Sequence, residues 1–110
     1  MISHVLMFVL LAAPSPGNLN QARQTYSGCL GTLLKSNLKE RVAPDAFETT
    51  VSTACKTEEA TFRNASVSID LAMGVKRTDA EQNANLEITD IVDNTKARYK
   101  DYVETNTEPR

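Results

Sequence analysis

Both cysteines of the chain lie in the stretch YSGCLGTLLKSNLKERVAPDAFETTVSTAC, residues 26–55. Pro44 divides this stretch in two, and Asp45 directly after it can cap a new helix. On both sides of the proline, apolar residues recur every three or four positions, which is the spacing of a helix that buries one face. The stretch therefore predicts two antiparallel helices joined by a turn centred near residue 42.

One register places the two cysteines opposite each other. In an antiparallel helix pair the numbers of contacting residues have a constant sum, and a turn near residue 42 makes Cys55 the partner of Cys29. A disulfide requires Cα atoms about 4.4–6.8 Å apart, which is closer than most helix pairs come. Gly28 and Gly31 flank Cys29 and would permit this approach, because they lack a side chain. We therefore expect a disulfide between Cys29 and Cys55 that fastens the first hairpin.

Other roles for the two cysteines fit the sequence less well. They could be buried free thiols, a reactive redox pair or ligands of a metal ion. A thioredoxin-like redox pair has nearly adjacent cysteines, and these two are far apart in the chain. A zinc site usually has four ligands, and the only histidine, His4, lies in a segment that we expect to be removed. We predict no metal site and no cofactor.

Helical spacing extends over the remainder of the chain. It predicts three helices, over residues 19–41, 45–73 and 78–104. Thr78 and Glu81 at the start of the third helix have the spacing of a capping box. We expect an all-α fold, a three-helix antiparallel arrangement with a disulfide-stapled first hairpin.

Residues 67–75 allow a different interpretation. Apolar and polar residues alternate there, as in a half-buried strand, and residues 84–89 contain a shorter alternation. A β-hairpin formed by these two segments would make the fold α+β. We favour the helix, because the helical rhythm of the preceding residues continues through Ile69 and Met73.

Val67 and Leu71 form a second apolar stripe if this segment is helical. They then lie away from the helix face that carries Phe62 and Ile69. Such a stripe would contact a neighbouring helix or a partner chain. Val67 and Leu71 are therefore our candidate interaction face, for a protein partner or for self-association.

The N-terminal segment differs in composition from the remainder. No charged residue precedes Arg23, and residues 5–13 form an apolar run of nine. A membrane-spanning helix needs about 20 apolar residues, whereas the core of a signal peptide has about 7–15. The segment lacks the Lys or Arg with which a signal peptide usually begins. A buried element of a cytosolic protein is therefore the alternative.

We predict a signal peptide at residues 1–17, cleaved after Gly17. A single helical domain would follow at residues 18–104, and a flexible tail at residues 105–110. This organisation predicts a periplasmic or secreted protein that keeps no stable membrane anchor after the signal is removed.

The composition excludes several functional classes. Beyond His4 the chain has no histidine, which excludes Ser-His-Asp and Cys-His nucleophilic systems from the expected mature protein. Its four scattered glycines form no phosphate-binding loop. A net charge of −2 without a basic cluster argues against nucleic acid as a partner. We expect a non-enzymatic exported protein that acts as a binding or structural module.

One carboxylate supports an alternative, enzyme-associated role. Glu58 lies on the apolar face of the second segment, between Cys55 and Phe62. The register that pairs the cysteines also places Tyr26 opposite Glu58. A hydrogen bond between Tyr26 and Glu58 would stabilise the hairpin, and the pair could supply a partly buried acid.

Four residues also form a recognisable pattern. Tyr26 and Cys29 give Tyr-x-x-Cys, and Cys55 and Glu58 give Cys-x-x-Glu after the hairpin. In this pattern the chain resembles small exported bacterial helical proteins of the alphaproteobacterial type. The resemblance implies an envelope location and a disulfide-tied hairpin, and it implies no activity.

Overall fold

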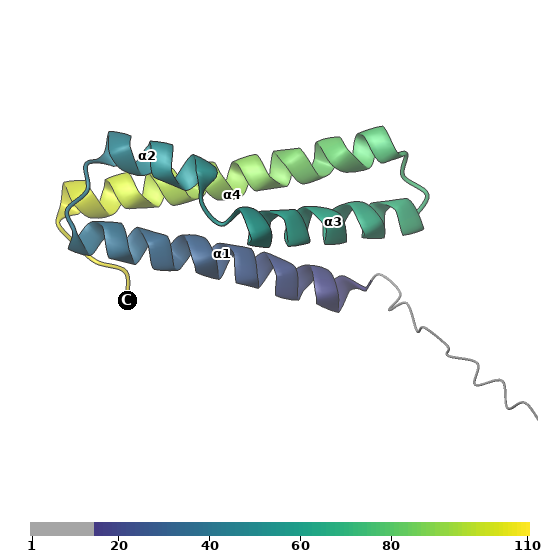
Figure 1. Ribbon diagram of the computed structural model, residues 1–110, viewed down its shortest axis with the longest axis horizontal. Coiled ribbons are helices and arrows are strands. Elements are labelled where there is room, and N and C mark those ends of the chain that lie inside the picture. The colour runs from purple at the N-terminus through teal and green to yellow at the C-terminus, as the bar shows by residue number, and fades with distance from the viewer. Residues whose placement is uncertain (1–14) are drawn as a thin grey trace, which may run out of the picture.

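Four α-helices make up most of the described chain. The computed structural model describes residues 15–110, with α1 at Pro16–Lys39, α2 at Pro44–Thr53, α3 at Lys56–Ala72 and α4 at Arg77–Thr105. Figure 1 shows them lying side by side as an elongated bundle. The predicted all-α class is confirmed for these residues. None of their helices combines the length and the apolar content that crossing a bilayer requires.

Two details of the fold prediction are wrong. The bundle has four helices instead of three, because the helix expected over residues 45–73 is divided into α2 and α3. The alternative α+β fold is not formed, because residues 67–72 belong to α3 and residues 84–89 to α4. The predicted signal-peptide core at residues 5–13 lies outside the described residues.

Local sequence sets the helix starts. Ser15 caps α1, and its hydroxyl accepts a hydrogen bond from the backbone N–H of Asn18 at 3.2 Å. Pro44 occupies the first turn of α2, where its missing N–H costs nothing. The expected capping box at Thr78 is absent, because α4 already begins at Arg77 and no side chain caps it. Asp45 likewise lies inside the first turn of α2 and does not cap it.

The break between α2 and α3 comprises two residues. Ala54 is extended, with φ −84° and ψ 160°, and Cys55 adopts the left-handed conformation, with φ 58° and ψ 37°. The second half of α2 is rich in Ser and Thr, whose hydroxyls donate to carbonyl oxygens three or four residues earlier and so weaken a helix. These residues are Thr49, Thr50, Ser52 and Thr53.

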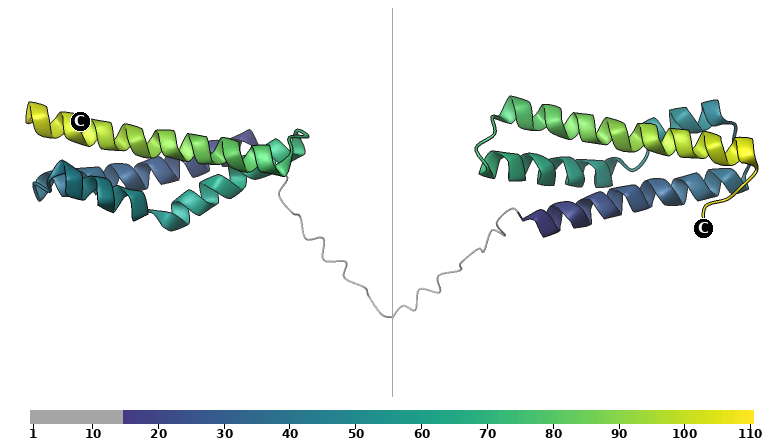
Figure 2. Two further views of the ribbon diagram at one scale, coloured as in Figure 1. Left: turned by 90° about the horizontal axis from the view of Figure 1, so that it is seen from above. Right: turned by 180° about the vertical axis from the view of Figure 1, so that it is seen from behind.

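The break redirects the chain. Figure 2 shows α2 and α3 meeting at an angle instead of forming one rod. As a result α3 packs against both α1 and α4, whereas α2 packs mainly against α4 and touches α1 only slightly. The bundle therefore has one end built from α1, α2 and α4, and another built from α1, α3 and α4.

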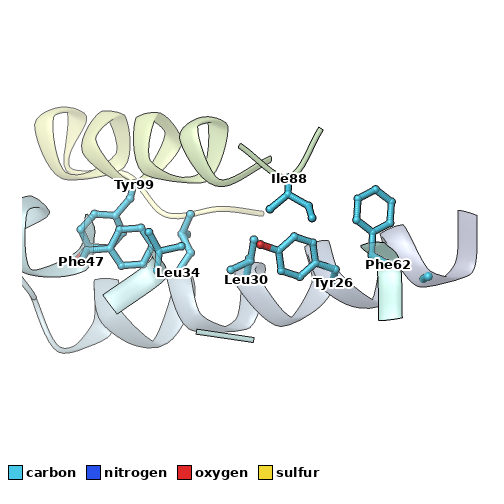
Figure 3. Close-up of a cluster of buried hydrophobic side chains, with 9 residues drawn as sticks. Tyr26, Leu30, Leu34, Phe47, Phe62, Ile88 and Tyr99 are labelled. Carbon is cyan, nitrogen blue, oxygen red and sulfur yellow. The ribbon is translucent and has the colours of Figure 1, made fainter. Parts of the chain in front are cut away.

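Aromatic pairs mark the core at each end. Phe47 of α2 stacks on Tyr99 of α4, with ring centroids 3.9 Å apart. Tyr26 of α1 and Phe62 of α3 form the other pair, with centroids 6.2 Å apart. Figure 3 shows Leu30, Leu34 and Ile88 between and around these pairs. The buried residues of this main core are Ala22, Tyr26, Leu30, Leu34, Phe47, Val51, Phe62, Ile88 and Tyr99.

A smaller cluster joins α3 to α4 near their connecting turn. Val67 packs there with Ala80 and Ala84, and both alanines are fully buried. Leu71 and Val75 cover the edge of this cluster. Because the residues on the α4 side are small, the two helices can approach closely here.

Candidate functional site: the disulfide junction and the α3–α4 groove

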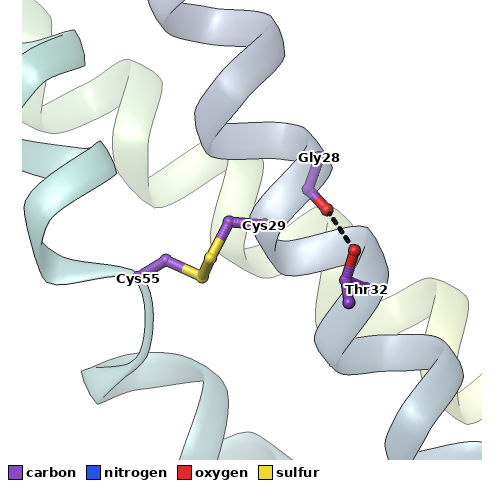
Figure 4. Close-up of a disulfide and its surroundings, with 4 residues drawn as sticks. All are labelled: Gly28, Cys29, Thr32 and Cys55. Atoms are coloured by element: carbon purple, nitrogen blue, oxygen red, sulfur yellow. Dashed lines mark hydrogen bonds between the residues drawn. A yellow bond between two sulfur atoms is a disulfide. The ribbon is translucent and has the colours of Figure 1, made fainter.

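A disulfide joins Cys29 in the middle of α1 to Cys55 at the α2–α3 junction (Figure 4). The Cα atoms of the two cysteines are 6.1 Å apart, within the range that a disulfide requires. Both cysteines are half-buried. The predicted pairing is therefore confirmed in the structure.

Our prediction that Gly28 and Gly31 permit the close approach of the two cysteines is wrong. A Cβ atom added at Gly28 or Gly31 would meet nothing within 4 Å, so no backbone lies against these glycines. The approach comes instead from the break in the facing chain, where Cys55 stands outside both helices. Cys55 is the residue that precedes α3, and no side chain caps that helix.

Glu58 lies beside the disulfide. One of its carboxylate oxygens and the two Sγ atoms of Cys29 and Cys55 all lie within 4.8 Å of one another. Its side chain is half-buried, and no hydrogen bond or ion pair of Glu58 occurs among residues 15–110. Sequence reasoning placed Glu58 on this face because it follows Cys55 by about one helical turn.

Tyr26 and Glu58 do not form the expected hydrogen bond in the described structure. Tyr26 stacks on Phe62, one turn beyond Glu58, because the two non-helical residues at the break change the register that a continuous helix would have. Burial and, to a smaller extent, the Glu59 carboxylate raise the pKa of Tyr26 to about 12, and the Arg63 guanidinium partly opposes both effects. Tyr26 is thus a buried core residue that stays protonated at neutral pH.

Charged side chains cross the bundle above this core. The Arg23 guanidinium of α1 donates to Glu87 of α4 at 2.7–2.8 Å, and its central carbon lies 5.4 Å from the ring centroid of Phe62. Arg63 of α3 donates to Glu59 at 3.1 Å and to Asn85 of α4. Sequence spacing does not identify the contacts of Arg23 with Glu87 and of Arg63 with Asn85, since it gives no partner on another helix.

The candidate interaction face lies against a neighbouring helix. Val67 is buried against Ala80 and Ala84 of α4, and Leu71 packs beside it, half-buried. The contact with a neighbouring helix, one of the two outcomes that we expected, is therefore formed. Both residues also line a groove of about 430 Å³ between α3 and α4, together with Arg63, Asn64, Ser68, Arg77, Glu81 and Asn85.

A larger cavity that sequence reasoning missed lies at the other end of the bundle. It measures about 820 Å³ and is bounded by the α1–α2 loop and the end of α4. Tyr99 closes its inner side, and its hydroxyl donates to the carbonyl of Val42 and lies 3.2 Å from that of Asn37. The cavity therefore depends on a loop that the end of α4 holds in place.

Comparisons of the chain with protein-family models, with curated proteins and with solved structures find no match. The resemblance to exported bacterial helical proteins thus rests on Tyr26, Cys29, Cys55 and Glu58 alone, and it stays a prediction.

Proposed function

We propose that this protein is a non-enzymatic, exported helical module that binds a protein partner in the periplasm or outside the cell. The Cys29–Cys55 disulfide is the observation that carries the location. Disulfides persist in oxidising compartments and are rare where cellular thiols keep cysteines reduced. A half-buried disulfide at a helix junction would be reduced in a cytosol, so an exported protein is the better fit.

The α3–α4 groove is the surface that we assign to the partner. Its floor is apolar, formed by Val67 and Leu71, and its rim carries the exposed guanidinium of Arg77. Arg77 lies 4.0 Å from Glu81, a weak pairing that leaves it free to bind another carboxylate. The partner would present an apolar side chain next to an acidic one. A structural role in the envelope through the same contact belongs to this proposal.

Intact mass spectrometry of protein recovered from its native host tests the location. The sample is alkylated with and without prior reduction. We expect a mass that lacks the predicted signal peptide, residues 1–17, and no alkylation until a reductant is added. A full-length mass with two freely alkylated thiols would overturn the exported location.

Site-specific photo-crosslinking in the native host tests the binding surface. A photoreactive residue replaces Ser68, which is exposed and lines the groove, and in a control it replaces Gln82, which is exposed elsewhere. We expect an adduct from position 68 only. Arg77→Glu should remove it, whereas Arg98→Glu, at an exposed position outside the groove, should not. Equal adducts from both positions would contradict the assignment.

The enzyme-associated alternative rests on Glu58 as a partly buried acid near Tyr26. Glu58 is half-buried beside the disulfide, but Tyr26 stacks on Phe62 and no hydrogen bond joins Tyr26 to Glu58 in residues 15–110, so we favour the binding module.

A further inference from the structure

We propose that reduction of the disulfide turns Cys29, Cys55 and Glu58 into a binding site for a thiophilic divalent cation of the Zn²⁺ class. The two thiolates and the carboxylate would be its protein ligands. The oxidised protein would not bind the ion, because a disulfide sulfur carries no thiolate charge. This proposal does not depend on the partner-binding role proposed above.

The distances suit such a site. The two sulfur atoms and the Glu58 oxygen already lie within 4.8 Å of one another. In tetrahedral zinc sites the metal lies about 2.3 Å from sulfur and about 2.0–2.2 Å from oxygen, which puts the ligand atoms about 3.5–3.8 Å apart. Once the disulfide is reduced, the two sulfurs can separate to that distance by rotation of the cysteine side chains, whose Cα atoms lie 6.1 Å apart.

The position of Glu58 is the second argument. Cys55 and Glu58 stand one turn apart at the start of α3, so they project on the same side toward Cys29 of α1. Glu58 makes no hydrogen bond or ion pair with another residue of the range 15–110. Its carboxylate is therefore available as a ligand, and a cation between Glu58 and the thiolates would not have to displace a protein partner.

The site is open to solvent on the side of Glu58. A groove of about 430 Å³ between α1 and α3 has Glu58 in its wall, together with Asn18, Gln21, Ala22, Thr25, Thr57 and Thr61. The groove is open to solvent, so water can reach the carboxylate and fill the fourth coordination position, as it does in zinc sites with three protein ligands.

The reduction step needs a dithiol reductant. A thiolate of the reductant attacks one sulfur of the Cys29–Cys55 bond and expels the other cysteine as a thiolate. The second thiol of the reductant then attacks the mixed disulfide and expels the remaining protein thiolate. The protein gains two electrons and two protons, and the reductant leaves as a disulfide. Binding of the cation then displaces the two thiol protons. Affinity for the cation would therefore depend on the thiol redox state and on pH.

Titration with Zn²⁺ alone tests the proposal. The full chain is reduced, freed of reductant without oxygen, and titrated by competition with a chromophoric chelator; Co²⁺ in parallel reports tetrahedral thiolate coordination by its visible absorption. We expect one ion per reduced chain and none per oxidised chain. Glu58→Gln should weaken binding at least tenfold, and Glu48→Gln, at an exposed position on α2, should not change it.

Three results would overturn the site. They are absence of binding by the reduced chain, equal binding by the oxidised chain, and unchanged affinity in Glu58→Gln, which would leave only a pair of cysteines. Thermal unfolding of the reduced wild type, with and without Zn²⁺, checks that the reduced chain is still folded. Binding to the native state must raise Tm as the Zn²⁺ concentration rises, and a reduced chain that stays unfolded in Zn²⁺ also contradicts the proposal.

Discussion

At one end of the bundle Phe47 of α2 stacks on Tyr99 of α4, and the Tyr99 hydroxyl bonds to the backbone of the α1–α2 loop. At the other end α3 meets α4 through Val67 and the fully buried Ala80 and Ala84. The first contact uses large rings and a hydrogen bond, and the second uses small residues that let two backbones approach. Different substitutions should therefore destabilise the two ends. The first end should lose stability when a ring or the hydroxyl is removed, and the second when a larger side chain is introduced.

The disulfide at the junction of the two ends should give the largest effect. We expect the double variant Cys29→Ala, Cys55→Ala to lose about 3.5 kcal/mol of unfolding free energy, because its unfolded chain is no longer cross-linked. Chemical denaturation measures this loss, and hydrogen exchange should show the α2 end opening before the α3 end, since α2 has few contacts with α1. Uniform exchange at both ends would show that they unfold as one unit.

Added volume should damage the end with small residues. Ala84→Leu places a larger side chain in a fully buried contact, and we expect a loss of about 2 kcal/mol. Ala97→Leu, at an exposed position on the same helix, is the matched control and should change stability by less than about 0.5 kcal/mol. Equal unfolding midpoints for the two variants would mean that α3 and α4 can move apart around the larger side chain without loss of stability.

Alkaline pH should lower the stability of the fold through ionisation of Tyr26. In the unfolded chain its hydroxyl ionises near its ordinary pKa of 10.0, whereas in the folded protein the pKa is raised to about 12. The stabilising contribution is thus fully present below pH 10 and is lost as the pH rises to 12, by up to about 1.4 kcal/mol per pH unit. Denaturation at several alkaline pH values measures this slope, which Tyr26→Phe should reduce.

The two buried tyrosines offer a smaller, direct comparison of the ends. Tyr99→Phe removes the hydrogen bond to the α1–α2 loop and leaves the Val42 carbonyl without this partner, so we expect a loss of about 1 kcal/mol. Tyr26→Phe should cost almost nothing at neutral pH, because the Tyr26 hydroxyl has no hydrogen-bond partner in residues 15–110. Thermal unfolding of both variants provides the test, and a larger loss for Tyr26→Phe would reverse the comparison.

The pair of Arg23 and Glu87 should give the smallest effect. It joins α1 to α4 over the ring of Phe62, but both side chains are partly exposed to solvent. A double-mutant cycle with Arg23→Ala and Glu87→Ala should give a coupling of about 0.5 kcal/mol that decreases in high salt. A coupling that salt does not change would contradict an ion pair that solvent screens.

The sequence predicted the parts of this fold that depend on local pattern. Helical spacing identified the helical class, and the register across Pro44 identified the partner of Cys29. The break at Cys55 was not predictable in this way. Phe47, Val51 and Phe62 are all buried, as they would be on a single continuous helix, and only the contact of α2 with α4 requires the interruption.

The same break explains what was missed at the candidate site. It shifted Phe62 onto Tyr26 and left Glu58 beside the sulfurs. The run of Ser and Thr before Ala54 was the available signal, since such residues weaken a helix. Their effect is small for each residue, so the run alone does not decide whether a helix continues.

The covalent link also determines how the chain can be pulled or threaded. Cys29 and Cys55 are separated by 26 positions and close a ring that contains the last part of α1 and all of α2. Tension applied to the two chain termini passes through the sulfur–sulfur bond, so this ring does not extend. A translocase or protease that draws the polypeptide through a narrow pore must admit two strands at once here, or wait until the bond is reduced.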